Sequence, residues 1–324
     1  MSTDTAPLTA AEAAEAGHLL TAITDNVRQV IIGKDDEIGL LLIAMLAGGH
    51  VLIEDVPGVG KTSLVSALAG SIDCSFRRIQ FTPDLLPSDV TGFSFYNQKS
   101  SEFEFIPGGV MGHLVLADEI NRAAAKTQSA LLEAMEEQQV TVDGKTYPLE
   151  PPFMVLATQN PVESFGTYPL PEAQLDRFLL KLSLGYPTAE EEVRVIGLPR
   201  RRKQSLRPAA SGEDILRLSR MAERVTVTPE LVRYIVQIVA ATRSSADTVL
   251  GSSPRGSIAL HRASQACALL RGREYVLPDD IKFLAPYVLP HRLVLTQEAK
   301  LRGRTAENVI DQILDSVLVP VGSK

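Results

Sequence analysis

The stretch His50-Val-Leu-Ile-Glu-Asp-Val-Pro-Gly-Val-Gly-Lys-Thr-Ser63 decides the fold. It starts as an apolar run that predicts a buried strand, continues as a glycine-rich loop and leads into the helical pattern of residues 62–69. A strand, such a loop and a helix in this order form a cradle for phosphate groups, because backbone N–H groups and the helix N-terminus both attract an anion. We therefore expect nucleotide binding by Asp55, Pro57, Gly58, Val59, Gly60, Lys61, Thr62 and Ser63.

Several residues of this loop have a defined expected role. Gly58 and Gly60 permit close approach of the backbone, Lys61 reaches oxygens of the β- and γ-phosphates, and the Thr62 hydroxyl ligates Mg²⁺. Asp55 stands where the usual pattern has its first glycine, which removes a positive-φ option but leaves the glycines nearest the phosphate intact. The alternative interpretation is a glycine-rich turn capped by a threonine.

Short strand-like runs recur on the carboxyl side of this loop, and helical patterns such as residues 127–137 lie between most of them. The runs are residues 75–81, 113–117, 153–158 and 178–184. Strands that alternate with helices favour an α/β fold with a parallel, doubly wound sheet. Two intervals, 93–106 and 139–148, instead alternate around polar turns and predict inserted β-hairpins.

Polar side chains follow two of the expected strands. Asp118 and Glu119 end an apolar run, and in a doubly wound sheet that end faces the ligand crevice. We expect Asp118 to hold Mg²⁺ through water and Glu119 to orient or deprotonate the attacking water. Asn160 follows the next strand and is expected to sense the γ-phosphate through its amide. A solvated strand end for the carboxylates and a turn at Asn160-Pro161 are the alternatives.

The chain has 324 residues, room for about two domains, with a formal charge of −7. We expect an N-terminal helix and tail at 1–28, a nucleotide-binding α/β core at 29–186 and a small all-helical domain at 187–324, whose predicted helices are 189–196, 213–222, 229–242, 254–270 and 278–288. Residues 1–186 carry 11 basic against 24 acidic side chains, and residues 187–324 carry 21 against 15. Modules of opposite sign attract each other, within one chain or between copies; uneven surface solvation is the alternative.

Composition narrows the class of protein further. Cys74 and Cys267 lie in apolar surroundings and fit reduced packing residues better than a disulfide framework or a metal site. No export signal is visible, and the longest apolar run, 38–47, is too short to span a bilayer, so we expect a cytoplasmic protein. The five histidines show no ligand spacing, and the basic run 200–203 is typical of a solvated linker, less often of a contact for acidic partners or nucleic acid.

Five segments together resemble the MoxR family of AAA+ ATPases, and the resemblance extends over roughly residues 29–319. The segments are Glu54-Asp-Val-Pro-Gly-Val-Gly-Lys-Thr62, Leu116-Ala-Asp-Glu-Ile-Asn-Arg-Ala123, Lys126-Thr-Gln-Ser-Ala-Leu-Leu-Glu-Ala-Met-Glu-Glu137, Ala157-Thr-Gln-Asn-Pro161 and Ala173-Gln-Leu-Asp-Arg-Phe178. The family pattern includes the aspartate at position 55.

The resemblance implies a ring-forming ATPase, commonly a hexamer, that holds ATP and Mg²⁺ between subunits. Arg177 matches the position of an arginine finger that reaches the neighbouring subunit's ATP, and Arg255 matches a lid arginine that touches the γ-phosphate in cis. A guanidinium suits either role because it stabilises charge spread over phosphoryl oxygens. For Arg177, a surface ion pair with Asp176 or Glu172 is the alternative.

The resemblance also places both hairpins near the central pore of the ring, where they couple nucleotide state to a protein client. Exposed aromatic residues would contact that client, whereas the same alternation also fits packing on the sheet; the residues concerned are Phe93, Phe95, Phe103 and Phe105.

The leading hypothesis is a Mg²⁺-dependent ATPase, a chaperone that remodels or matures protein complexes with a von Willebrand factor A-like partner. A nucleic-acid motor is the first alternative, but the hairpins supply only Lys99 and Lys145 to follow phosphates. A nucleotide-gated switch with little turnover is the second, and the presence of Glu119, Asn160 and Arg177 argues against it. The sequence names neither the client nor the partner.

Overall fold

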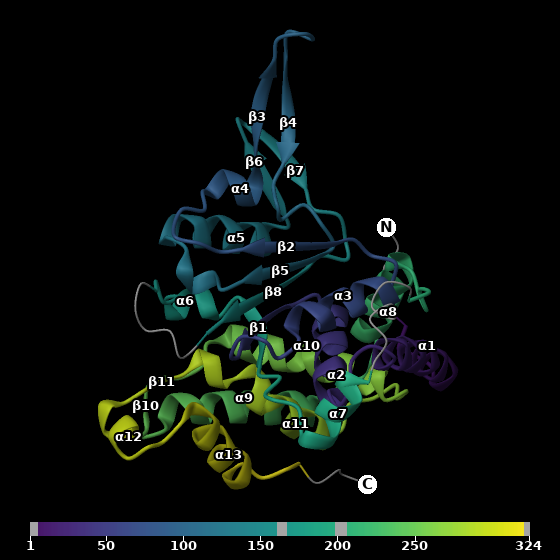
Figure 1. Cartoon of the computed structure of the whole chain (residues 1–324). Helices are drawn as coiled ribbons and strands as arrows, with labels where there is room; N and C mark the ends of the chain where they lie inside the picture. The colour runs from purple at the N-terminus through teal and green to yellow at the C-terminus, as the bar shows by residue number, and fades with distance from the viewer. Residues whose placement is uncertain (1–5, 161–166, 198–205, 321–324) are drawn as a thin grey trace.

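The computed structural model describes residues 6–160, 167–197 and 206–320. At its centre lies a five-stranded sheet whose neighbouring strands all pair in parallel, in the order β2-β5-β8-β1-β9 (Figure 1). The strands are β1 (His50–Glu54), β2 (Phe76–Gln80), β5 (Leu114–Asp118), β8 (Met154–Gln159) and β9 (Phe178–Leu182). Each predicted strand is present, and the parallel α/β fold is confirmed.

The sheet is buried on both faces. Successive residues of its strands point to opposite faces and belong to two different apolar clusters. In β1, Val51 and Ile53 join one cluster and Leu52 joins the other. The first face is covered by helices that include α1 (Ala10–Arg28), α2 (Asp35–Leu46) and α3 (Lys61–Ser71), and the second mainly by α5 (Ala125–Glu137). This two-sided burial explains why the strands read as continuous apolar runs.

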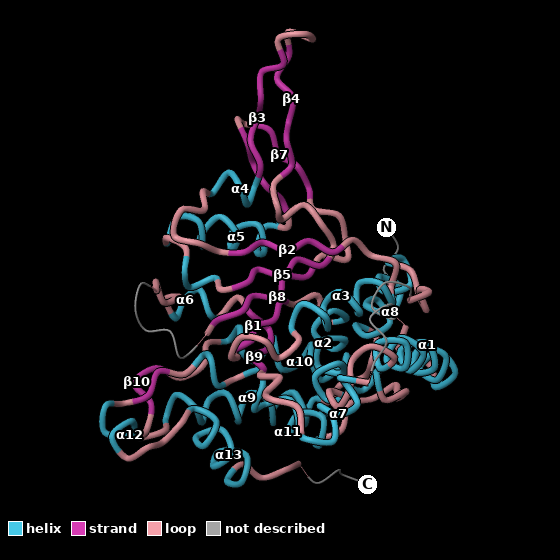
Figure 2. The backbone as a smooth tube through the Cα atoms, in the orientation of Figure 1, coloured by secondary structure: helices cyan, strands magenta, loops and turns pink. Residues whose placement is uncertain are grey.

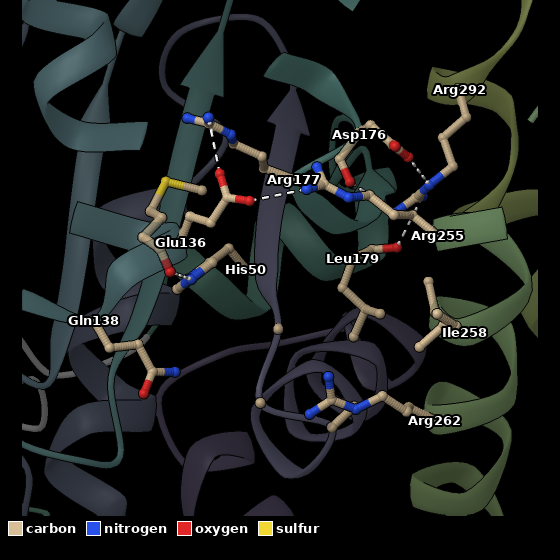
Figure 3. Close-up of a pocket in the computed structure, with 15 residues that line it drawn as sticks. His50, Glu136, Gln138, Asp176, Arg177, Leu179, Arg255, Ile258, Arg262 and Arg292 are labelled. Carbon is tan, nitrogen blue, oxygen red and sulfur yellow. Dashed lines mark hydrogen bonds and ion pairs between the residues drawn. The ribbon is translucent and has the colours of Figure 1, made fainter. Parts of the chain in front are cut away.

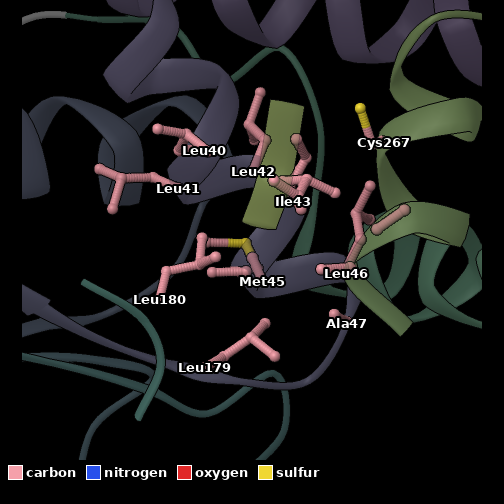
Figure 4. Packing of buried hydrophobic residues seen from close by; sticks show 14 of the residues in the cluster. Leu40, Leu41, Leu42, Ile43, Met45, Leu46, Ala47, Leu179, Leu180 and Cys267 are labelled. Carbon is pink, nitrogen blue, oxygen red and sulfur yellow. The ribbon is translucent and has the colours of Figure 1, made fainter. Parts of the chain in front are cut away.

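Helix α2 forms the centre of the larger cluster. Its apolar residues are buried almost without interruption from Leu40 to Leu46, which lets it contact neighbours on several sides. Figure 4 shows these side chains between β9, represented by Leu179 and Leu180, and the helix that carries Cys267. The N-terminal helices thus share one core with the last third of the chain.

Both predicted hairpins are present and lie one above the other (Figures 1 and 2). The longer one, β3 (Gly92–Asn97) with β4 (Glu102–Pro107), follows the short helix α4 (Pro87–Thr91) and projects farthest from the body; the shorter one is β6 (Gln139–Val142) with β7 (Lys145–Pro148). Phe105 stacks on Tyr147 with ring centroids 3.9 Å apart and joins the two hairpins. Phe93, Phe95 and Phe103 stay exposed.

Beyond β9 the chain is mainly helical, and all five predicted helices are present. They are α7 (Ala189–Ile196), α8 (Gly212–Glu223), α9 (Pro229–Ser244), α10 (Pro254–Leu270) and α11 (Pro278–Val288), with α12 (Gln297–Leu301) and α13 (Ala306–Ser316) added near the end. The expectation of an all-helical domain was wrong in one respect: β10 (Thr248–Leu250) and β11 (Val294–Leu295) pair antiparallel. Strands of three and two residues are too short to show a period-2 pattern.

Opposite charges of the two halves meet within the chain. Glu12 and Glu15 of α1 pair with Arg224 and Arg217 at 3.1 Å each. Some of the acidic residues of the first half therefore pair with basic residues of the second half within one subunit. The basic run 200–203 lies outside the described residues. Within the described ranges, no helix combines the length and the apolar character needed to cross a bilayer.

Candidate nucleotide site and its arginine pair

The glycine-rich loop leads from β1 into α3, as the sequence predicts. Gly58 and Gly60 have φ values of 90° and 95°, and a Cβ added at either would meet no atom of the described residues within 4 Å. Backbone conformation, rather than crowding, therefore requires glycine at both positions. A cavity of about 330 Å³ opens beside the loop and is lined by Asp55, Pro57, Gly58, Gly60, Lys61, Thr62, Ser63, Arg78, Asp118, Glu119, Thr158 and Asn160.

The structure thus brings together nearly all residues that the sequence predicts for phosphate and metal. Lys61 Nζ donates to the carbonyl oxygens of Asp55 and Val56, at 3.3 and 3.2 Å, which places its ammonium group over the loop. Val59 is the exception, because it packs against the apolar cluster and is not among the residues that line the cavity.

Asp55 has a structural contact that sequence reasoning missed. Its buried carboxylate accepts hydrogen bonds through Oδ2 from the backbone N–H groups of Leu184 and Gly185, the latter at 3.2 Å. A carboxylate would repel a phosphate, so these bonds explain how an aspartate is accommodated at this position. Asp55 therefore lines the cavity and also holds the loop against the segment after β9.

The two carboxylates at the end of β5 are held differently. Asp118 Oδ1 accepts from Thr158 Oγ1 and Oδ2 accepts from the Arg78 guanidinium, both at 2.6 Å. Glu119 Oε2 accepts from Gln80 Nε2 at 3.0 Å and from Arg122 at 2.8 Å. These bonds hold both acids at the rim of the cavity.

The backbone of Glu119 is left-handed, with a φ of 56° that is uncommon outside glycine. Its N–H donates to Thr158 Oγ1 at 2.9 Å, so Thr158 fixes Asp118 and Glu119 together. Strained backbone that its surroundings hold in place is typical of a reacting group.

Sequence reasoning missed Arg78, Gln80, Thr158 and Arg122 as partners of these acids. In β2, Arg78 pairs with Leu116 and Gln80 with Asp118, so both lie beside the carboxyl end of β5. The signal was available in the polar residues that interrupt β2, but their importance depends on which strand lies next to it.

A second cluster of predicted residues lies at the amino ends of β1 and β9, at the opposite end of the strands from the glycine-rich loop. Arg177 comes directly before β9, whose first residue pairs with His50, the first residue of β1. Its guanidinium bonds to Glu136 Oε2 at 2.9 Å, and that of Arg255 bonds to Glu136 Oε1 at 2.9 Å. Figure 3 shows the two arginines on either side of the Glu136 carboxylate.

The structure does not bring Arg255 beside Lys61, where a contact with the γ-phosphate in cis would place it. Arg255 is not among the residues that line the cavity beside Lys61, and it lies with Arg177 at the amino end of β1. β1 lies between the two places, and its five residues extend over roughly 13 Å from His50 to Glu54 at about 3.3 Å per residue. The location of Arg255 depends on how α10 packs against the core, and the sequence pattern does not predict that packing.

Among the residues that the structure describes, Arg177 pairs with Glu136 and not with Asp176 or Glu172, the alternative partners. Asp176 instead pairs with the buried guanidinium of Arg292, at 2.9 Å. Lys181 forms a further bridge between the parts of the chain, to Glu54 at the start of the loop at 3.2 Å and to Glu307 of α13 at 3.1 Å.

His50 is a structural residue, as expected from its lack of ligand spacing. Its Nδ1 accepts from the Val155 N–H at 3.0 Å, so Nε2 carries the proton and donates to the Met135 carbonyl at 3.1 Å. Burial lowers the pKa of His50 to about 4 and keeps the ring neutral. Both cysteines are free, and burial raises the thiol pKa of Cys74 to about 11 and of Cys267 to about 12.

Comparison with known proteins gives the family. Residues 50–180 match the profile described as the ATPase family associated with various cellular activities (AAA), and residues 240–313 match the AAA lid domain. The chain is 45% identical over 316 residues to Chaperone MoxR1 of Mycobacterium tuberculosis, across 94% of this chain and 83% of that protein. The chain belongs to the MoxR family of AAA+ ATPases.

Two further proteins match this chain over most of its length. The chain is 57% identical over 305 residues to the uncharacterized protein YeaC of Bacillus subtilis, across 94% of this chain and 95% of that protein. A crystal structure from Cytophaga hutchinsonii superposes with a TM-score of 0.90 at 42% identity and covers 95% of this chain and 97% of its own. The protein is an ATPase with an AAA+ core and a helical lid.

Proposed function

We propose that this MoxR-family ATPase hydrolyses ATP with Mg²⁺ at sites shared between neighbouring subunits of a ring, with six subunits as the family pattern suggests. The observation that carries the proposal is that Lys61 and Glu119 lie at the carboxyl ends of the parallel strands, whereas Arg177 and Arg255 lie at the amino ends of β1 and β9. One subunit therefore offers a cradle and carboxylates on one side and a pair of cations on the other.

The residues beside the cradle fit Mg²⁺ and a triphosphate. Mg²⁺ prefers oxygen ligands and takes one or two protein groups together with phosphates and water, and the Thr62 hydroxyl and the Asp118 carboxylate meet that need. When bound, the ion supplies charge stabilisation for the leaving phosphates.

The chain's own residues then divide the work. Lys61 holds β- and γ-phosphate oxygens, Glu119 takes a proton from the attacking water, and the Asn160 amide orients that water or the γ-phosphate. Arg177 and Arg255 act on the nucleotide of the neighbouring subunit, where their charge stabilises the transferring phosphoryl group.

For the cellular role, we propose a chaperone that remodels or matures protein complexes together with a von Willebrand factor A-like partner, in the cytoplasm. The name of the relative Chaperone MoxR1 supports the chaperone role, and the free, unreactive cysteines fit that compartment. The exposed aromatic residues of the β3–β4 hairpin are the proposed client contacts: Phe93, Phe95, Tyr96 and Phe103.

Two variants test the hydrolytic part. Lys61→Ala removes the cation that faces the phosphates, so ATP binding is lost, whereas Glu119→Gln keeps binding but loses hydrolysis. Equilibrium binding of a fluorescent ATP analogue and release of phosphate measure the two effects. Lys126→Ala, at an exposed position of α5, is the matched control and keeps both activities. Ordinary turnover in Glu119→Gln would remove Glu119 from the catalytic role.

A further inference from the structure

Glu136 lies between Arg177 and Arg255 and has no role in the proposed reaction as described so far. It is the second-last residue of α5, and its two carboxylate oxygens bond separately to Arg177 and Arg255, each at 2.9 Å. One carboxylate therefore holds two guanidinium groups side by side (Figure 3). Two cations this close repel each other unless an anion lies between them.

The backbone that carries the arginines is fixed by separate contacts. Asp176, which precedes Arg177, bonds to Arg292 and accepts from Ser253 Oγ at 3.0 Å. Ser253 is the N-cap of α10, and its hydroxyl accepts from the Arg255 N–H at 3.1 Å. This network anchors the segment before β9 to α10 without Glu136. The contribution left to Glu136 is the direction of the two guanidinium groups.

The arginine pair can still bind an anion while both arginines are paired with Glu136. Within the described part of the chain, the buried Nε of Arg177 has no hydrogen-bond partner. A cavity of about 240 Å³, lined by His50, Met135, Glu136, Asp176, Arg177 and Arg255, opens at the same place. An anion that enters there meets two oriented guanidinium groups.

We propose that Glu136 is a positioning residue for the arginine pair, which it holds at the spacing needed to contact the terminal phosphate of a nucleoside triphosphate bound to the neighbouring subunit. The inference rests on the proposed shared site. Glu136 acts through the arginines. Its loss therefore lowers ATP hydrolysis in the neighbouring subunit and leaves nucleotide binding in its own subunit unchanged. The ion pairs are partly exposed, so Glu136→Gln is expected to fold.

The test places the defect in a subunit that cannot hydrolyse ATP. Wild-type protein is mixed with excess Lys61→Ala, whose intact arginines serve wild-type sites, and phosphate release per wild-type subunit is measured. Lys61→Ala combined with Glu136→Gln should lower that rate about tenfold at unchanged KM. Glu136→Asp in the same background should restore part of it. Native mass spectrometry confirms equal incorporation of each variant.

Two controls separate the possible failures. Glu137→Gln, which removes the same charge one residue later at an exposed position of α5, should behave as Lys61→Ala alone. Lys61→Ala combined with Arg177→Ala tests the shared site itself. If Arg177→Ala lowers the rate and Glu136→Gln does not, the role of Glu136 is refuted and the shared site stands. If neither lowers it in mixed rings, both are refuted.

Discussion

Removal of the Asp55 carboxylate should destabilise the protein by an amount that its contacts determine. Both hydrogen bonds, from the N–H groups of Leu184 and Gly185, end on the same oxygen, Oδ2. Asp55→Ala leaves both donors without this acceptor. A buried donor without a partner costs about 1 to 3 kcal/mol, and Leu184 is buried while Gly185 is partly exposed, so we expect a loss of about 3 kcal/mol.

Asp55→Asn is the discriminating variant. Its amide oxygen can occupy the place of Oδ2 and keep both bonds, so only the charge assistance is lost, about 1 kcal/mol. Equilibrium urea denaturation measures both variants, with Asp311→Ala, at an exposed position of α13, as the control with no change. Equal losses for Asp55→Asn and Asp55→Ala would show that the bonds through Oδ2 do not hold the loop.

Three further outcomes follow from single contacts. NMR titration of His50 should give a pKa near 4, below its ordinary 6.5. Between pH 6.5 and 4 the unfolded state binds more protons than the folded state, so the free energy of unfolding falls by up to about 3 kcal/mol as the pH drops through this interval. A measured pKa near 6.5 would contradict a buried ring. Lys181→Met removes the ion pairs that join Glu54 of β1 to Glu307 of α13 and should cost about 1 kcal/mol in urea denaturation, because each partly exposed pair contributes about 0.2 to 1 kcal/mol; no cost would mean that neither pair stabilises the protein. Phe103→Ser should change the thermal midpoint little because the side chain is 70% exposed, whereas Phe105→Ser should lower it because the ring stacks on Tyr147; equal shifts would refute this distinction.

Local patterns were sufficient for most of the fold. The apolar run before the loop, the two glycines and Lys61 predict strand, cradle and helix because neighbours in sequence form them. Asp143-Gly144 predicts the short hairpin for the same reason, and it has the expected positive φ values of 49° and 76°. Asp118 and Glu119 lie beside the loop, as expected, because the carboxyl ends of parallel strands lie on the same side of the sheet.

The remaining parts of the site depend on contacts between distant segments. Arg78 reaches Asp118 only because β2 lies beside β5. Asp55 finds its donors 129 residues away, at Leu184, where no local signal marks them. The place of Arg255 depends on how α10 packs against the core, and its approach to Glu136 spans 119 residues. Side-chain partners of this kind follow from packing, which sequence periodicity does not describe.

The most direct test of the shared site is complementation between two inactive variants. Lys61→Ala cannot bind ATP but offers an intact Arg177, and Arg177→Ala binds ATP but lacks the cation for its neighbour. Each alone should be inactive, and mixed rings should regain phosphate release because Lys61-intact sites receive Arg177 from the other variant. Rings shown by native mass spectrometry to contain both variants, and that still release no phosphate, would contradict the shared site.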